Sequence, residues 1–234
     1  HMTAYHYPKD VRIRSYAPVR KAHSKQISRA ATLLLTARRP IIYTGGGVVP
    51  SGAAKQLTTL VERLGHPCTN TLMGLGALPS DHPRFLGMLG MHGTYEANMA
   101  MYECDVMLAV GARFDDRVTG DLKKFSPHAK IIHIDIDPAS IGKNVSVEVP
   151  IVGDASAALE QLLEALGQSK TQQDEQSLSQ WWEQIKSWRS RDSLGYDGSD
   201  DVIKPQFVVE KLHEVTLGDA FVTSDVGQHQ MWAA

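Results

Sequence analysis

The chain has 234 residues, 42% of them hydrophobic, so it can form one large domain with a sizeable core. Its 24 basic residues nearly balance its 26 acidic ones, and no long basic run occurs. This balance argues against nucleic acid or an anionic membrane surface as a partner. The apolar runs have the length of strands, far below the roughly 20 residues of a membrane span.

The ends of the sequence differ from its middle. His1-Met2 is typical of the scar of a cleaved tag, and residues 1–22 predict an extended entry. Residues 220–226 predict a buried strand, which residues 227–234 follow as a loop before the chain stops. We therefore expect a fragment of a longer protein. Cys68 and Cys104 fit no disulfide or metal motif, and we interpret them as buried free thiols.

Helices and short apolar strands alternate along residues 23–167. In chain order the patterns predict a helix over 24–37, a strand over 40–44, a helix over 51–64 capped by Ser51, a strand over 67–71, an irregular stretch over 78–93, a helix over 94–103 capped by Thr94, strands over 105–110 and 130–135, a short helix over 138–144, a strand over 147–152 and a helix over 155–166. This order predicts an α/β fold with a doubly wound, mainly parallel sheet and helices on both faces.

The last third of the chain is less regular. Residues 168–204 are interpreted as a linker that includes a helix over 179–191. Trp181, Trp182 and Trp188 predict a packing face on that helix, directed at another domain or a subunit. A helix over 206–215 begins after Pro205, with Phe207, Val208 and Leu212 expected to face inward. Residues 205–234 would then start a further domain.

Glycines and polar residues follow the predicted strands, where ligands of doubly wound sheets bind. Glycine turns at 45–47, 71–76 and 111 allow backbone amides to approach a phosphate, and Arg113 and Arg117 supply charge for a diphosphate. Asp135 is placed to accept from ribose hydroxyls or an adenine amine, while Met73 and Met91 offer apolar surface to a flat ring. These features predict a dinucleotide site.

The standard motifs are incomplete. Neither the loop at Gly45 nor the loop at Gly74 contains the last glycine of G-x-G-x-x-G, and no G-x-x-x-x-G-K-[ST] occurs. The alternative that these glycines only form tight turns stays open. The acids at 115–116 and 135–137 are interpreted as solvated or helix-capping groups rather than metal ligands. His133 is interpreted as a hydrogen-bonded core histidine.

Several long strings resemble the central domain of acetohydroxyacid synthase (acetolactate synthase) catalytic subunits. They lie at residues 71–76, 89–94, 111–120, 133–138, 141–144 and 227–234, in order along nearly the whole chain. Enzymes of this family condense two pyruvates, or pyruvate and 2-ketobutyrate, with loss of CO2 in branched-chain amino-acid biosynthesis. They need thiamine diphosphate, Mg2+ and FAD.

The resemblance also implies the cofactor contacts. FAD contacts are expected from Gly46, Thr71, Leu72, Leu89, Gly90, Met91, His92, Gly111, Ala112, Arg113, Phe114, Asp115, Arg117, Asp135, Ile136, Asp154 and Ala155. Gln228 and His229 match thiamine diphosphate contacts, and Asp116 and Arg117 match the substrate channel. No catalytic residue or metal ligand is implied for this chain, because the family's thiamine-activating glutamate and its Gly-Asp-Gly segment for Mg2+ are missing. We expect no synthase activity from this chain alone.

The resemblance further implies 2-keto acid substrates, a homo-oligomer of catalytic subunits and a regulatory subunit. It implies the bacterial cytoplasm, or a plastid in a plant, as the location. Two alternatives stay open. One is the central domain of another thiamine-dependent carboligase, and the other is a non-catalytic module that binds NAD or another nucleotide, or only a neighbouring subunit.

Overall fold

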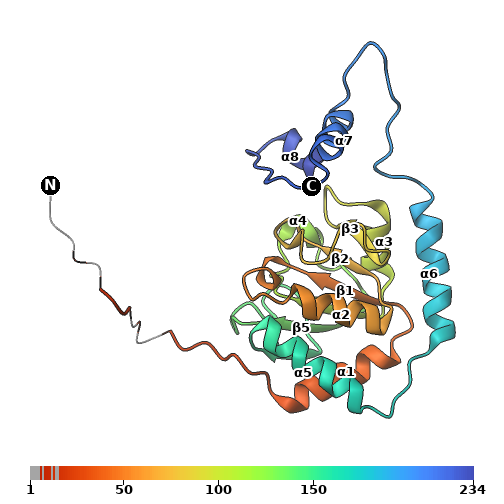
Figure 1. Ribbon diagram of the computed structural model, residues 1–234. Helices are drawn as coiled ribbons and strands as arrows, with labels where there is room; N and C mark the ends of the chain where they lie inside the picture. Colours follow the sequence, from red (N-terminus) through yellow and green to blue (C-terminus); the bar gives the residue numbers. More distant parts are fainter. Residues whose placement is uncertain (1–5, 7, 12, 14–15) are drawn as a thin grey trace.

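The computed structural model describes residues 6, 8–11, 13 and 16–234. Six parallel strands form one sheet in the order β3-β2-β1-β4-β5-β6, and Figure 1 labels β1, β2, β3 and β5 of them. They are β1 (Pro40–Thr44), β2 (Cys68–Asn70), β3 (Phe85–Met88), β4 (Val106–Val110), β5 (Lys130–Asp135) and β6 (Val149–Val152). The chain moves outward from β1 to one edge and then returns to build the other half from β4. The predicted doubly wound parallel sheet is confirmed.

Helices cover both faces of this sheet. The helices are α1 (Ser24–Thr36), α2 (Ala54–Leu64), α3 (Tyr95–Glu103), α4 (Asp116–Thr119), α5 (Ala155–Gln168), α6 (Glu175–Arg189), α7 (Pro205–Thr216) and α8 (Gln228–Ala233), with short 3-10 turns η1 (Gly46–Val48) and η2 (Leu72–Gly74). Helices α1, α2 and α5 cover one face and α3 and α6 the other, while α7 and α8 lie beyond the sheet (Figure 1). Successive strand residues point to opposite faces, so Ile42 packs with α1, α2 and α5, whereas Ile41 and Tyr43 pack with α3 and α6. Both faces of the strands are therefore buried, which explains their continuous apolar sequences.

The ends of the helices follow from local sequence. The Thr94 hydroxyl accepts from the Ala97 N–H at 3.2 Å and begins α3, as predicted. Asp154 caps α5 through the Ala157 N–H in the same way. Gly65 ends α2 in the left-handed conformation, with φ of 68°.

Three local predictions were wrong. The stretch over 78–93 contains β3, a short edge strand whose interior Gly87 weakened the strand pattern. Ser51 does not cap α2, because its hydroxyl donates to the Val48 carbonyl at 2.9 Å and closes the turn before the helix. Residues 138–144 form turns rather than a helix, since Asp137 binds the next turn through the Ala139 N–H and Gly142 has a positive φ.

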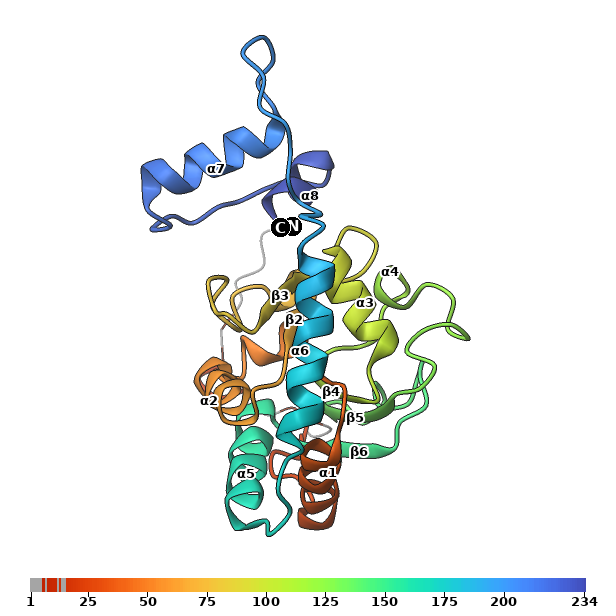
Figure 2. The ribbon, with the colours of Figure 1, turned by 90° about the vertical axis from the view of Figure 1, so that its right-hand side faces the viewer.

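Helix α6 begins earlier than predicted and lies in front of the strands in Figure 2. The indole N–H of Trp181 donates to the Pro40 carbonyl at 2.9 Å, and that of Trp182 donates to the Gly65 carbonyl at 2.8 Å. The Trp181 and Trp188 rings meet edge to face, with centroids 5.5 Å apart. The predicted packing face is confirmed, but its partner is this chain's own sheet and not a second domain or subunit.

The C-terminal predictions hold in part. Helix α7 begins at Pro205 as expected, but none of its residues is buried, so Phe207, Val208 and Leu212 do not face a core. Residues 220–226 form no strand, and Phe221 is fully exposed, because no neighbouring strand pairs with them in the described part of the chain. Residues 228–233 form α8 instead of a loop.

No helix in the described ranges is long and apolar enough to cross a membrane. Both cysteines are buried free thiols, as predicted. Burial raises the pKa of Cys68 and Cys104 to about 12, so both thiols stay protonated at neutral pH.

His66 is a buried titratable group in the core. Neither ring nitrogen has a hydrogen-bond partner within the described residues. Burial, helped by the charge of Arg84, lowers the pKa of His66 from 6.5 to about 3. Between these two pH values the unfolded chain binds a proton that the folded chain does not. The free energy of unfolding is therefore highest above the unfolded pKa of 6.5. It falls by about 1.4 kcal/mol per pH unit as the pH drops through this window.

Urea denaturation across this pH window measures that slope. We expect His66→Leu to remove this contribution and His128→Gln, at an exposed position, to retain it. An identical acid response of both variants and the parent chain would mean that other groups cause the loss of stability.

Candidate functional site

Two adjoining hollows lie at the carboxyl ends of the strands, about 580 Å³ and 670 Å³ in volume. Gly47, Gly111 and Asp135 line both, so the two hollows adjoin at these residues, and together they are called the cleft. Gly45–Gly47 follow β1 and Gly111 follows β4, the two central strands between which the winding reverses. This switch point is where ligands bind in open α/β sheets.

Glycines allow the loops after β1 and β4 to touch. A Cβ atom on Gly45 would lie 2.3 Å from the Gly111 carbonyl oxygen, and one on Gly111 would lie 2.7 Å from the Gly47 Cα. The Gly45 N–H donates to the Val110 carbonyl and the Gly47 N–H donates to the Gly111 carbonyl. The glycines therefore serve tight packing, the alternative left open by the sequence, and at the same time keep the cleft wall free of side chains.

Charged groups line one wall of the cleft. The Arg113 guanidinium lies 2.6 Å from the Asp115 carboxylate, and its side chain is 80% exposed. Asp115 also caps α4 by accepting from the Arg117 N–H at 3.2 Å. Hydrogen bonding with Asp116 and then with this N–H holds the pKa of Asp115 below its ordinary value. A carboxylate thus anchors the loop that presents Arg113 and Arg117.

The second half of the cleft contains the other acids. Asp135 accepts from the Asp137 N–H at 2.8 Å, and Asp154 caps α5, so both carboxylates bind backbone N–H groups. The described residues contain no group of three or more potential metal ligands. His133 is buried and its Nε2 lies 2.8 Å from the Ala112 carbonyl, which confirms a hydrogen-bonded core histidine. Burial lowers the pKa of His133 and favours its neutral form.

The loop over residues 89–93 is connected to the same wall. The Asn98 side chain pairs with both backbone groups of Gly90, accepting from its N–H at 2.9 Å and donating to its carbonyl at 3.0 Å. The Met91 N–H donates to the Arg117 carbonyl at 3.1 Å. Asn98, which the sequence did not single out, therefore positions the exposed Met91 beside α4.

The predicted site residues separate into those that line the cleft and those that do not. The cleft is lined by Gly46, Thr71, Leu72, Gly111, Ala112, Arg113, Asp115, Arg117, Asp135, Ile136, Asp154 and Ala155. Leu89 is buried, Gly90 and Met91 stand beside α4, Asp116 begins α4, and His92 lines a different hollow near α8. The Phe114 ring packs in the core against Tyr43, while Gln228 and His229 lie in α8, outside the cleft.

In the hollow that contains Arg113, sequence reasoning missed Tyr43 and Val118. In the adjoining hollow it missed Tyr16, Pro18, Arg20, Pro50, Ser51, Ile134, Ser156, Ala157 and Glu160. Tyr43 stands in a buried strand two residues before three glycines, where its hydroxyl was the available signal. Val118 had none, because only the fold brings the first turn of α4 over the cleft.

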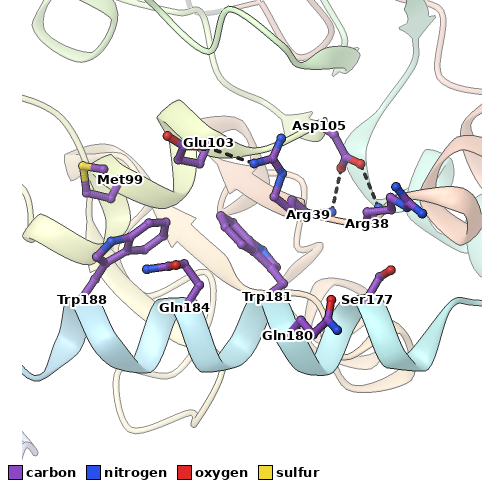
Figure 3. A pocket seen from close by; sticks show the side chains of 10 residues that line it. All are labelled: Arg38, Arg39, Met99, Glu103, Asp105, Ser177, Gln180, Trp181, Gln184 and Trp188. Carbon is purple, nitrogen blue, oxygen red and sulfur yellow. Dashed lines mark hydrogen bonds and ion pairs between the residues drawn. The ribbon is translucent and has the colours of Figure 1, made fainter.

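A third hollow, of about 710 Å³, lies near the amino ends of β1 and β4, between α3 and α6 (Figure 3). Three of its four charged side chains, all but that of Arg38, already have partners among the described residues. Arg39 contacts Glu103 at 3.2 Å, and the Asp105 carboxylate accepts from the backbone N–H groups of Arg38 and Arg39 at 2.9 Å each. These contacts stabilise the start of the strands, so the cleft at the opposite end remains the candidate ligand site.

The sheet order and the glycine-lined cleft define an α/β domain of the dinucleotide-binding architecture. The chain belongs to the family of thiamine pyrophosphate enzymes, whose central-domain model matches residues 27–162, more than half of the chain.

Among curated proteins, the chain is 53% identical over 230 residues to the acetolactate synthase isozyme 3 large subunit of Escherichia coli strain K12. It is 51% identical over 232 residues to the acetolactate synthase large subunit of Haemophilus influenzae. It is 48% identical over 236 residues to a probable acetolactate synthase large subunit of Methanocaldococcus jannaschii. Each alignment covers 98% of this chain but only 39–40% of the relative. The predicted resemblance to this family is confirmed.

Proposed function

We propose that this chain is the FAD-binding part of an acetolactate synthase large subunit. The whole protein would condense two pyruvates, or pyruvate and 2-ketobutyrate, with loss of CO2. It would use thiamine diphosphate and Mg2+, held mainly by other parts of the large subunit, in the cytoplasm of a bacterium. It would assemble with further catalytic subunits and a regulatory subunit. The observation that carries this proposal is the pair of adjoining hollows at the switch point of a chain 53% identical to a named synthase subunit.

The residues present fit a flavin dinucleotide. The glycine wall at Gly45 and Gly111, where a Cβ atom would collide with backbone, admits a ligand close to the main chain. Arg113 and Arg117 supply positive charge for the diphosphate, and Asp135 at the end of β5 supplies an acceptor for ribose hydroxyls. When bound, the flavin would support the architecture of the active centre without net redox chemistry, as the family resemblance implies.

Apolar side chains line the same hollow as Arg113 and Arg117 and offer a surface for the flavin ring. Met73 is largely exposed, and Val118 of α4 and Leu72 of η2 line the same hollow. A flat ring is accommodated by such surfaces, because methionine adapts its shape to its neighbours. Arg117 lines the same hollow and Asp116 precedes it in α4, and we propose that both border the substrate channel.

A thermal-shift titration of the chain with FAD tests the proposal. FAD at 100 times its dissociation constant is expected to stabilise the folded state by about 2.7 kcal/mol, which raises the melting temperature by roughly 5–10 °C for a domain of this size. NAD and ADP serve as controls. Stabilisation by NAD but not by FAD would support the alternative nucleotide-binding module, and no shift with any nucleotide would contradict an FAD site in this chain.

A charge variant locates the binding site. Arg113→Gln should weaken FAD binding about 10- to 100-fold, because the diphosphate loses a charged hydrogen bond. Arg38→Gln removes the same charge at the hollow near the amino ends of the strands and should leave FAD affinity unchanged. If both substitutions weaken FAD binding equally, either FAD binds elsewhere or Arg113 acts only through the net charge of the protein.

A further inference from the structure

Tyr43 connects the core to the cleft. It is the fourth residue of β1, its side chain is 1% exposed, and its ring meets Phe114 edge to face with centroids 5.4 Å apart. Tyr43 also lines the cleft together with Arg113, Arg117 and Val118. The ring is therefore held rigidly in the core while one part of the side chain borders the cleft.

The phenol oxygen is the part that reaches the cleft. Tyr43 is 1% exposed and its ring packs on Phe114, yet its oxygen is not among the fully buried polar atoms, so the hydroxyl is the part that borders the cleft. Burial, the largest cause, raises the pKa of Tyr43 well above its ordinary value of 10.0. The hydroxyl is thus protonated at neutral pH and available as a donor.

This hydroxyl has no hydrogen-bond partner among the described residues, and its oxygen is not sealed in the core. A donor at the wall of a cleft needs an acceptor from any ligand that excludes water from it. Thr44 and Thr69, which are buried in the same part of this sheet, each have a partner within the protein. Tyr43 differs from them in facing the cleft, where a bound molecule can supply the acceptor.

We propose that Tyr43 is a ligand-binding residue of the cleft whose hydroxyl donates a hydrogen bond to the flavin half of the bound nucleotide. Tyr43 lines the hollow that contains Met73, Arg117 and Val118, and it does not line the hollow that contains Ile136, Asp154 and Ala155. It therefore contacts the ribityl or ring portion of FAD and not the adenosine. This inference rests on the proposed function.

Tyr43→Phe tests the inference because it removes one oxygen and keeps the ring. Without ligand, the variant should melt at the same or a higher temperature, since the lost hydroxyl had no protein partner. Its FAD dissociation constant should rise about tenfold, the effect of one lost hydrogen bond, while its ADP dissociation constant should not change. Unchanged stability with weaker FAD binding is a combination that a purely structural tyrosine would not produce.

Tyr102→Phe, in α3 and away from the cleft, is the matched control and should alter none of these values. A melting temperature lowered by several degrees in Tyr43→Phe would overturn the inference, because it would reveal a partner inside the protein. An unchanged FAD dissociation constant would overturn it while leaving the proposed function intact. If the parent chain does not bind FAD, the proposed function and the ligand contact of Tyr43 both fail, and ligand-free melting still reports whether the hydroxyl is paired.

Discussion

Replacing Gly45 by alanine is expected to lower the free energy of unfolding by about 3 kcal/mol and to abolish nucleotide binding. The added Cβ would lie 2.3 Å from the Gly111 carbonyl oxygen, 2.6 Å from the Ala112 Cα and 2.8 Å from its Cβ. Two of these atoms belong to the backbone, so no side-chain rotation relieves the collision. The loops after β1 and β4 must separate, and the hydrogen bond from the Gly45 N–H to the Val110 carbonyl at 2.9 Å would be strained.

The cause of this effect is close approach and not backbone conformation. Gly45 has φ of −112°, which alanine adopts readily, so the whole penalty is steric. Gly198→Ala is the control, because a Cβ at that position meets nothing within 4 Å and should leave stability unchanged. Urea denaturation and FAD titration measure both variants. A Gly45→Ala chain as stable as the parent would show that the two loops have room to separate without loss.

Replacing Trp181 by alanine is expected to destabilise the fold by about 3–5 kcal/mol, the range for removing a large buried aromatic side chain. Trp181 is 3% exposed and lies between α6 and the sheet, where it packs edge to face against Trp188. Its indole N–H satisfies the Pro40 carbonyl at the start of β1. The substitution therefore leaves a cavity and an unpaired carbonyl at the same place.

Two further substitutions separate these contributions. Trp181→Phe keeps most of the ring but loses the N–H, and should cost about 1–3 kcal/mol. Trp182→Phe also loses an indole hydrogen bond, to the Gly65 carbonyl, but at a partly exposed position, and should cost less. Denaturant unfolding measures all three. A Trp181→Ala chain that unfolds like the parent would mean that α6 does not stabilise the sheet, in conflict with its packing.

The strand residues show why much of the fold was predictable. The continuously apolar segment 106–110 and the central residues 131–134 of β5 are buried on both faces, and this burial leaves a signal in the sequence. The edge strand β3 left little signal, because its four residues are mostly only partly buried and include a glycine. The strand predicted at 220–226, by contrast, does not form. Its sequence is largely apolar, but within the described part of the chain no neighbouring strand pairs with it.

The candidate site was likewise predictable only in part. The glycines, arginines and strand-end aspartates were predictable, because parallel strands bring their carboxyl ends to one edge of the sheet. The partner of the tryptophan face was not predictable, since periodicity identifies which residues of α6 are buried and leaves open what buries them.

By itself the sequence determined the parallel α/β class, the family and most of the loops that line the cleft, because these depend on local residue patterns and on long matching strings. Only the tertiary structure decided that α6 belongs to the sheet, that Gly45 and Gly111 let two loops touch, and that Tyr43 of a buried strand lines the cleft. Each of these depends on contacts between residues far apart in the chain, whose distances are set by packing and are not encoded in any short segment.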